Sequence, residues 1–207
     1  MSLTTAEGID ALLGRPMGDL GSEERIIVAA HAIYNETGAF PLPLSQVAER
    51  AEVSRSLIYS HFPDQLTLLN RLIDHHVATI APELIQALNR EKQFSKASFA
   101  VSELLFTHFV KYGRLIFQAP QDEYMRQVPD LELARLMRLI LVRLTRMASR
   151  QLDFRPKDGL FIILIMSAIP EEAARLVSTG QASFETAEAT LRRALKLTLR
   201  TLKKEMS

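Results

Sequence analysis

LSQVAERAEVSRSLIYSHF, residues 44–62, is the stretch that decides the fold. Its apolar residues form two stripes at helical spacing, and Val53 lies in the turn between them. Ser54 stands where the second helix begins, so its hydroxyl can accept a hydrogen bond from a backbone N–H of the first turn. The pattern predicts a helix-turn-helix unit, whose second helix enters the major groove of DNA. An ordinary helical hairpin has the same spacing and remains the alternative.

The residues around this stretch carry a family resemblance. The 45 residues from Arg25 to Leu69 contain, in order, Ala29-Ala30, Gly38, Val47-Ala48, Ala51-Glu52-Val53-Ser54, Ile58-Tyr59-Ser60-His61-Phe62 and Leu68-Leu69. This gapless pattern resembles the N-terminal domain of TetR-type (TetR/AcrR) transcriptional regulators. The resemblance implies an all-α subunit of about nine helices. A three-helix DNA-binding domain would come first, and a helical ligand-binding and dimerisation domain would follow.

The expected domain organisation follows from this resemblance. We expect a mobile arm over residues 1–21, the DNA-binding domain over 22–70 and the ligand-binding and dimerisation domain over 71–207. Ser22 is expected to cap the first helix and Gly38 to end it. Later helices are expected at about 64–90, 96–118, 130–150, 160–179 and 183–204. Pro82 and Pro170 predict a kink or an early stop in two of them.

Composition limits the class of protein. The 207 residues are 47% hydrophobic and 24% charged, as in a soluble globular protein. Cysteine is absent, so disulfides are excluded and a reducing cytoplasm is compatible. The start of the chain lacks the pattern of a signal peptide. The longest apolar run, Leu160–Ile169, is too short for a membrane helix, which needs about 20 residues. We therefore expect a cytoplasmic protein without a membrane partner.

Charge is distributed unevenly along the chain. Residues 1–91 contain 6 basic and 12 acidic residues, a net charge of −6. Residues 92–207 contain 19 basic and 12 acidic residues, a net charge of +7, so the total is +1. The half that is expected to bind DNA is therefore acidic, although nucleic-acid affinity comes mostly from neutralising phosphates.

The resemblance assigns DNA contacts position by position. They fall on Ser45, Gln46, Arg55, Ser56, Leu57, Tyr59, His61 and Gln65. Arg55 could read a guanine edge or bind a phosphate, while Tyr59 and His61 suit phosphates. For each of these residues, a solvated helix face is the alternative.

Four positions depart from the pattern of the family: Pro43 replaces a Thr, Glu52 the Gly of the turn, Ser56 a Gly and Gln65 a Lys. Each departure removes a phosphate contact, a flexible turn or positive charge. Weakened DNA binding is therefore an alternative prediction for this chain.

The C-terminal half is expected to hold an effector pocket and a dimer interface. His108 and Tyr112 lie one helical turn apart and are the best polar candidates for the pocket, because buried polar groups need partners. The predicted ligand-binding residues are Phe106, His108, Tyr112, Tyr124, Met125, Met137 and Met166, with plain core packing as the alternative. The segment 160–169 has more apolar surface than one exposed helix can carry, which indicates a homodimer. The predicted interface residues are Phe161, Leu164, Ile165, Ala168, Leu191 and Leu195.

Other candidate sites are weaker. Arg135, Arg138, Arg143, Arg146 and Arg150 share one face of the helix expected at 130–150, which could attract an acidic or phosphate-bearing ligand or could be a solvated basic face. His75 and His76 are adjacent and point about 100° apart on a helix, so we predict no metal site.

No catalytic motif, phosphate-binding loop or cysteine nucleophile is present, so we expect neither an enzyme nor a cofactor. The predicted partners are a palindromic double-stranded DNA operator, an unknown small-molecule effector and a second copy of the chain. The alternative is a dimeric helical protein of the same fold that binds a small molecule or a partner, with weakened or lost DNA binding.

Overall fold

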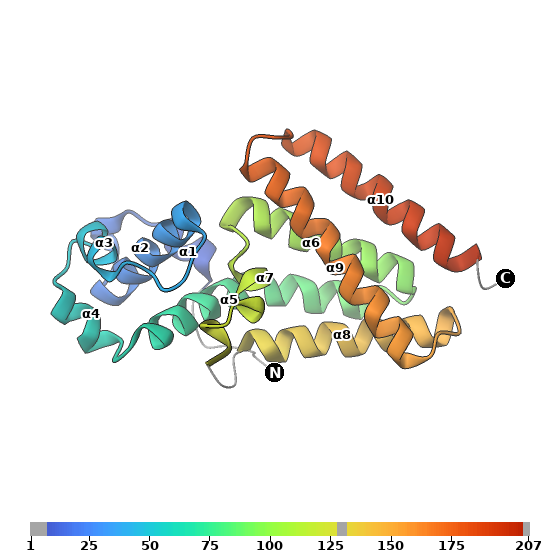
Figure 1. Ribbon diagram of the computed structural model, residues 1–207, viewed down its shortest axis with the longest axis horizontal. Coiled ribbons are helices and arrows are strands. Elements are labelled where there is room, and N and C mark those ends of the chain that lie inside the picture. Colours follow the sequence, from blue (N-terminus) through green and yellow to red (C-terminus); the bar gives the residue numbers. More distant parts are fainter. Residues whose placement is uncertain (1–7, 128–131, 205–207) are drawn as a thin grey trace. The chain divides into compact units, whose positions relative to one another are not determined.

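The computed structural model describes residues 8–127 and 132–204 (Figure 1). Within these ranges every regular element is helical, which confirms the predicted all-α fold. The α-helices are α1 (Ile9–Leu13), α2 (Ser22–Thr37), α3 (Leu44–Arg50), α4 (Arg55–His61), α5 (Gln65–Arg90), α6 (Phe94–Tyr112), α7 (Leu115–Gln118), α8 (Glu132–Gln151), α9 (Pro156–Ser178) and α10 (Phe184–Lys204). The same ranges also contain the short 3₁₀ helices η1 (Met17–Asp19), η2 (Ala119–Gln121) and η3 (Met125–Gln127). Among the described residues, no helix is long and apolar enough to cross a bilayer.

The chain forms two compact units. Among the described residues, the first comprises 8–79 and those within 115–135, and the second comprises 80–114 and 136–204. Both α5 and α8 begin in the first unit and end in the second. The boundary that we placed near residue 70 therefore lies inside a continuous helix.

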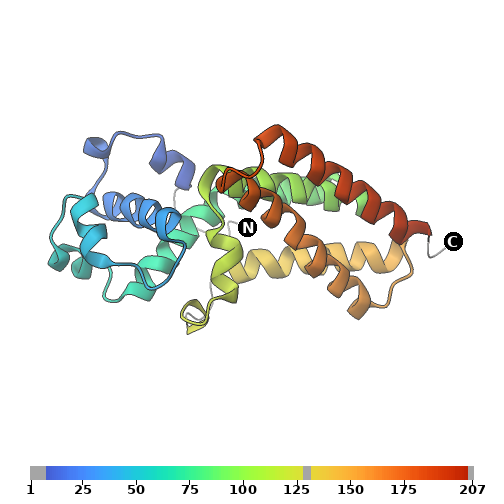
Figure 2. The ribbon, with the colours of Figure 1, turned by 45° about the horizontal axis from the view of Figure 1, so that its top comes forward.

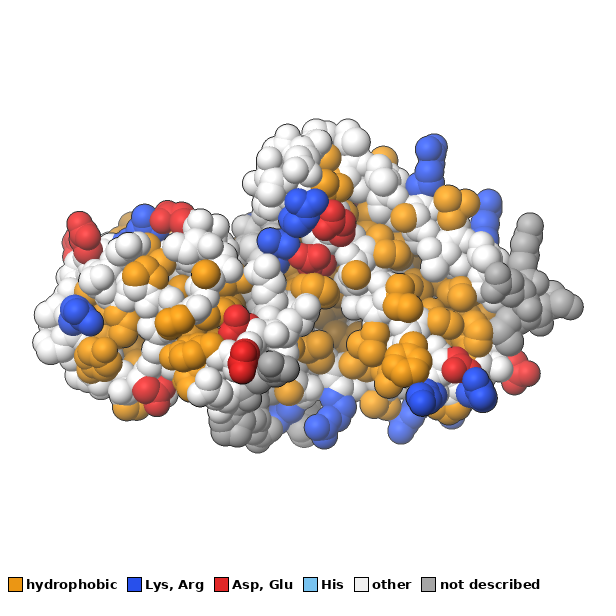
Figure 3. All heavy atoms as spheres, in the orientation of Figure 1, with side chains coloured by type: hydrophobic (Ala, Val, Ile, Leu, Met, Phe, Trp, Pro, Cys, Tyr) orange, Lys and Arg blue, Asp and Glu red, His pale blue; other side chains and the backbone are white. Residues whose placement is uncertain are grey.

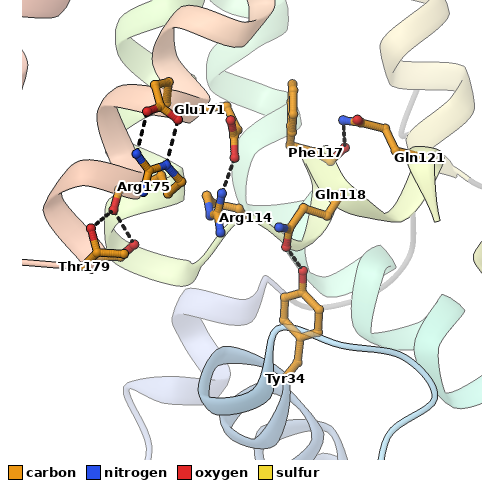
Figure 4. A network of polar contacts seen from close by, with 10 residues as sticks. Tyr34, Arg114, Phe117, Gln118, Gln121, Glu171, Arg175 and Thr179 are labelled. Carbon is orange, nitrogen blue, oxygen red and sulfur yellow. Dashed lines mark hydrogen bonds and ion pairs between the residues drawn. The ribbon is translucent and has the colours of Figure 1, made fainter.

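The first unit is built around α2. This helix packs against α1, α3 and α4, and its buried face includes Ile26, Ala30 and Ile33. The hydroxyl of Tyr34 on the same helix donates a hydrogen bond to the side-chain oxygen of Gln118 (Figure 4). These contacts fix the support on which α3 and α4 are mounted.

The arm that we predicted to be mobile contains an ordered helix where it is described. In α1, Ile9 and Leu12 are fully buried. The hydroxyl of Thr79 donates to the carboxylate of Asp10 over 2.9 Å. Two large apolar side chains therefore anchor this segment, whereas residues 1–7 of the predicted arm lie outside the described residues.

The ends of α2 show one wrong and one correct prediction. Ser22 does not cap the helix, because Gly21 occupies the cap position and its N–H donates to Glu24 Oε2 over 2.8 Å. Gly38 ends the helix as predicted, with φ of 63°. This left-handed conformation is accessible to glycine without strain, and the N–H of Gly38 donates to the carbonyl of Tyr34 over 2.7 Å.

The second unit is a packed layer of long helices. Its helix α9 packs against both α6 and α10 (Figures 1 and 2). The core contains Phe94 and Phe106 from α6, Met166 from α9, and Leu191 and Leu195 from α10. These side chains come from regular stripes on each helix, so Leu191 and Leu195 of α10 pack within the subunit.

Helix α6 differs from its predicted extent, and two prolines do not end the helices that contain them. Helix α6 ends at Tyr112, because Gly113 adopts φ of 85° and leaves the helical conformation. Helices α5 and α9 continue through Pro82 and Pro170 respectively. Each proline removes one backbone hydrogen bond. The interactions of two long, packed helices are sufficient to offset that loss.

Polar contacts hold the second half of α9. The Arg114 guanidinium donates to the carboxylate of Glu171, and Arg175 forms a two-pronged ion pair with Glu172 over 2.8 and 2.6 Å (Figure 4). The hydroxyl of Thr179 donates to the carbonyl of Arg175 over 2.9 Å near the end of the helix. These contacts stabilise α9 just after Pro170.

Candidate DNA-binding surface and effector domain

Helix α4 begins as the sequence predicts. The side chain of Ser54 accepts a hydrogen bond from the N–H of Leu57 over 3.1 Å, which satisfies one of the donors left open in the first turn. The Ser54 and Ser56 hydroxyls also lie 2.8 Å apart. A short helix gains little from propensity alone, so this cap and the buried contact of Ile58 define its start and its orientation.

The side chains of α3 and α4 separate into a buried and an exposed face. Val47, Ala48 and Ile58 are buried. The predicted DNA-binding residues Ser45, Gln46, Arg55, Ser56, Tyr59 and His61 are exposed, and Leu57 is half-buried. Tyr59 is the large exposed hydrophobic residue of α4, with 47% of its surface accessible. Seven of the eight predicted residues thus lie on two adjoining helices, whereas Gln65 is half-buried at the start of α5.

Arg55 is an exposed positive charge at the start of α4. It forms no ion pair with any residue that the structure describes, unlike Arg50, which binds Glu36 over 2.6 Å. Its position at the first residue of α4 leaves the guanidinium in solvent. A guanidinium can bind a phosphate or the edge of a guanine through two parallel hydrogen bonds.

His61 and Gln65 make contacts that the sequence did not reveal. His61 Nε2 lies 2.7 Å from the Ser22 hydroxyl, so the end of α4 is joined to the start of α2. The Gln65 side chain accepts from the N–H of Leu42 over 2.9 Å and donates to its carbonyl over 2.8 Å. Both ends of the Gln65 amide therefore bind the segment that precedes α3. This favours a role for Gln65 in positioning α3 over a direct contact with DNA.

Glu52 occupies the turn between α3 and α4 in an uncommon conformation. Its φ of 54° lies in the left-handed region, where glycine is unstrained and a residue with a Cβ is disfavoured. The neighbouring N–H of Val53 donates to the carbonyl of Ala48 over 3.0 Å, which closes the turn. The turn therefore has the backbone conformation that glycine favours, although a glutamate occupies it. The glutamate also adds an exposed negative charge.

The predicted ligand-binding residues are divided between the two units. Phe106, His108, Tyr112, Met137 and Met166 belong to the second unit, whereas Tyr124 and Met125 belong to the first. The His108 and Tyr112 rings lie 5.0 Å apart and both are buried, and the Phe106 ring lies 5.2 Å from that of Phe184. In the first unit, the backbone N–H groups of Tyr124 and Met125 donate to Asp122 Oδ1. Burial, and then the nearby Asp64, raise the pKa of the Tyr124 hydroxyl.

A groove in the second unit lies on the arginine face of α8. It has a volume of about 460 Å³ and is formed between α8 and the last turn of α5 with the residues that follow it. Arg143, Arg146 and Arg150 line it, as the sequence analysis of this face allowed. The apolar residues that line it include Leu139 and Met147, which were not among the predicted ligand-binding residues.

The predicted dimer residues divide between the surface and the core. Phe161, Leu164, Ile165 and Ala168 are exposed on α9, and Ile165 keeps 73% of its surface accessible. Hydrophobic side chains also gather over this face of the second unit (Figure 3). By contrast, the assignment of Leu191 and Leu195 is wrong, because both are fully buried inside the subunit. On α10 the exposed residue is Leu197, which is 59% accessible.

Comparison with known proteins agrees with this geometry. Residues 26–72 match the model of "Bacterial regulatory proteins, tetR family". The HTH-type transcriptional activator FasR of Mycolicibacterium smegmatis is 26% identical over 98 residues. That match covers 45% of this chain and 44% of FasR, so the chain spans less than half of that relative.

Solved structures share the fold over most of the chain. A TetR transcriptional regulator from Legionella pneumophila has a TM-score of 0.64 at 17% identity, covering 86% of this chain and 97% of that one. FadR from Bacillus subtilis in complex with stearoyl-CoA has a TM-score of 0.63 at 14% identity, covering 84% and 96%. Residues 26–72 are therefore similar to the helix-turn-helix segment of TetR-family regulators, and the chain shares its helical fold with solved TetR-type structures.

Proposed function

We propose that this protein is a homodimeric repressor that binds a palindromic operator and leaves it when a small molecule binds. The observation that carries the proposal is the exposed face of α3 and α4, where Arg55 and Tyr59 project from a capped, well-anchored helix. In a dimer, the two copies of α4 would enter successive major grooves about 34–36 Å apart. Ser45, Gln46, Ser56, Leu57 and His61 would complete the contact surface.

The exposed apolar residues of α9 support the dimer. Phe161, Leu164, Ile165 and Ala168 follow the spacing i, i+3, i+4 and i+7, so they form one continuous stripe. A stripe of this kind is self-complementary when two copies meet about a two-fold axis, which is the common arrangement of homodimers. We extend the proposed interface to Leu197 of α10, in place of Leu191 and Leu195.

The effector would act by shifting a conformational equilibrium. A ligand can release DNA only if it binds one spacing of the two recognition helices more tightly than the other. The structure of FadR from Bacillus subtilis with stearoyl-CoA supports the general idea that this fold holds small molecules. His108 and Tyr112 remain proposed effector contacts, because they place two polar rings together inside the helical layer of the second unit.

The first experiment is a DNA-binding titration. Purified protein is titrated against DNA from upstream of its own gene, with a scrambled duplex as control, at low and moderate salt. Arg55→Ala and Tyr59→Ala should abolish sequence-specific binding without changing the oligomeric state. Arg193→Ala removes an equal charge from an exposed position of α10 and should leave binding unchanged. Sequence-specific binding that survives both recognition-helix changes would show that α4 does not read DNA.

A second candidate function is a helical ligand-binding protein that keeps the fold without operator binding. The net charge of −6 over residues 1–91 and the exposed Glu52 favour it. Salt dependence separates the two functions, because each phosphate contact releases counterions and gives a slope of about −0.9 in log K against log salt. Selection from random DNA that yields no common sequence would favour this second function.

A further inference from the structure

The groove on α8 concentrates positive charge. Arg143, Arg146 and Arg150 line it at spacings of three and four residues, and Lys92 adds a fourth cation. Glu91 is the acidic residue of the lining and forms an ion pair with Arg90 over 3.0 Å. The lining therefore has four positive charges and one negative charge, a net of +3. None of the three arginines forms an ion pair with a residue that the structure describes.

The same groove has an apolar part. Leu88 of α5 and Leu139, Val142 and Met147 of α8 contribute to its lining. Val142 keeps 42% of its surface accessible. These apolar side chains and the arginines therefore line one groove. The juxtaposition suits a ligand with one charged end and one apolar end.

The frame of the groove is held in place by backbone contacts. Gln151 Oε1 accepts from the N–H of Phe94 over 2.8 Å, and Gln151 Nε2 donates to the carbonyl of Lys92 over 2.7 Å. This side chain joins the end of α8 to the connection between α5 and α6. Two hydrogen bonds from one side chain therefore join the two segments that line the groove.

We propose that this groove binds a small amphipathic anion. Its carboxylate or phosphate group lies among Arg143, Arg146 and Arg150, since guanidinium groups pair with both through short, charge-assisted hydrogen bonds. Its apolar part lies against Leu139 and Met147. The volume of about 460 Å³ is within the range of about 300–1,000 Å³ that is usual for small-molecule sites. This inference concerns binding alone and does not rest on the proposed operator binding.

Calorimetric titration of the full chain tests the proposal. Decyl phosphate and decanoate are used below their critical micelle concentrations. Inorganic phosphate is the control that lacks the apolar chain, and decyltrimethylammonium is the control that lacks the anionic group. We expect saturable binding of at least one of the two anions, with one site per subunit. The anion with the lower dissociation constant shows whether the groove prefers a phosphate or a carboxylate head group. Inorganic phosphate should bind at least about tenfold more weakly, and the cation should not bind. Absence of saturable binding by both anions overturns the proposal, as does equal binding by inorganic phosphate.

Variants on α8 locate the site. Replacing both Arg146 and Arg150 by Gln should raise the dissociation constant about tenfold or more, as expected for lost charge-assisted hydrogen bonds. Val142→Asp should weaken binding as well, because it places a carboxylate beside the anion. Arg138→Gln is the matched control, since Arg138 is an exposed arginine of the same helix outside the lining. Unchanged binding in the double variant, or an equal loss in the control, places the anion elsewhere and overturns the proposal.

Discussion

Replacing Asp74 by Asn should stabilise the protein at neutral pH. Asp74 is a half-buried residue of α5, and its Oδ1 is buried without a hydrogen-bond partner among the described residues. Burial raises the pKa of its carboxyl from an ordinary value of 3.8 to about 6, with Arg71 lowering it and Glu132 raising it further. The charged form is thus disfavoured in the folded state, and asparagine keeps the shape without the charge.

The size of the effect follows from this pKa difference. A difference of about two units corresponds to roughly 3 kcal/mol at most, at 1.36 kcal/mol per unit. Because Asp74 is partly exposed and solvent screens its charge, we expect about 1 kcal/mol for Asp74→Asn at pH 7.5. This corresponds to a rise in melting temperature of about 2–4 °C for a chain of this size.

The pH dependence gives the sign of the effect. Below about pH 4, Asp74 is protonated in both folded and unfolded states, so burial carries no charge penalty. Between about pH 4 and 6 the unfolded state loses its proton first, and stability falls as pH rises. Above pH 6 the full penalty is present. The difference in melting temperature between Asp74→Asn and the natural protein should therefore grow from pH 4.5 to pH 7.5.

A second aspartate provides the control. Asp64 accepts hydrogen bonds from the backbone N–H of Thr67 over 2.7 Å and from its hydroxyl over 2.9 Å. These bonds lower the pKa of Asp64, so Asp64→Asn should not stabilise the protein at pH 7.5. Thermal unfolding is followed by circular dichroism across the pH range. An Asp74→Asn variant that is less stable at pH 7.5, or equally shifted at all pH values, would refute the reasoning.

Four further changes test single features of the structure. Glu52→Gly should stabilise the protein by about 0.5–1 kcal/mol in urea unfolding by relieving the left-handed strain, and it should tighten DNA binding by removing a negative charge. Glu52→Gln separates the two effects, because it removes the charge and keeps a side chain that is disfavoured in the left-handed region. Ser54→Ala should cost about 1 kcal/mol through loss of the α4 cap, measured in the same way. Leu195→Ala should cost about 2–5 kcal/mol of folding stability while the protein stays dimeric in sedimentation, since Leu195 is core. Ile165→Asp should instead give folded monomers in sedimentation; a folded dimer would remove α9 from the interface.

Sequence patterns were most informative where the signal is local. Gly38 ends α2 in the left-handed conformation and Ser54 caps α4, and both follow from the chemistry of one residue and its nearest turn. The fold class could be predicted for the same reason, because helical periodicity is a local property. The Ser22 cap was wrong by one position, since Gly21 also satisfies the requirements of a cap and Glu24 supplies the missing acceptor.

The sequence did not show which surface packs against each apolar helix face. A stripe of Leu191 and Leu195 shows that α10 has an apolar face, and it does not show which surface covers that face. The structure covers it with the subunit itself, while Ile165 and Leu197 remain in solvent. For the same reason the ligand-binding residues could be chosen only by size and polarity. The arginines of α8 were visible as a face, but the opposing wall from α5 becomes evident only in three dimensions.

The helix-turn-helix region also shows what a residue that departs from the family pattern does in this structure. At the position of a family lysine, Gln65 uses both ends of its amide to hold Leu42, and His61 lies within hydrogen-bonding distance of Ser22. Polar groups that fasten the domain are less available to phosphates, so the proposed contact depends more heavily on Arg55 and Tyr59. One such surface would bind weakly. Two surfaces joined in a dimer act at high effective concentration, so the apolar stripe of α9 matters as much to the proposed operator binding as α4 does.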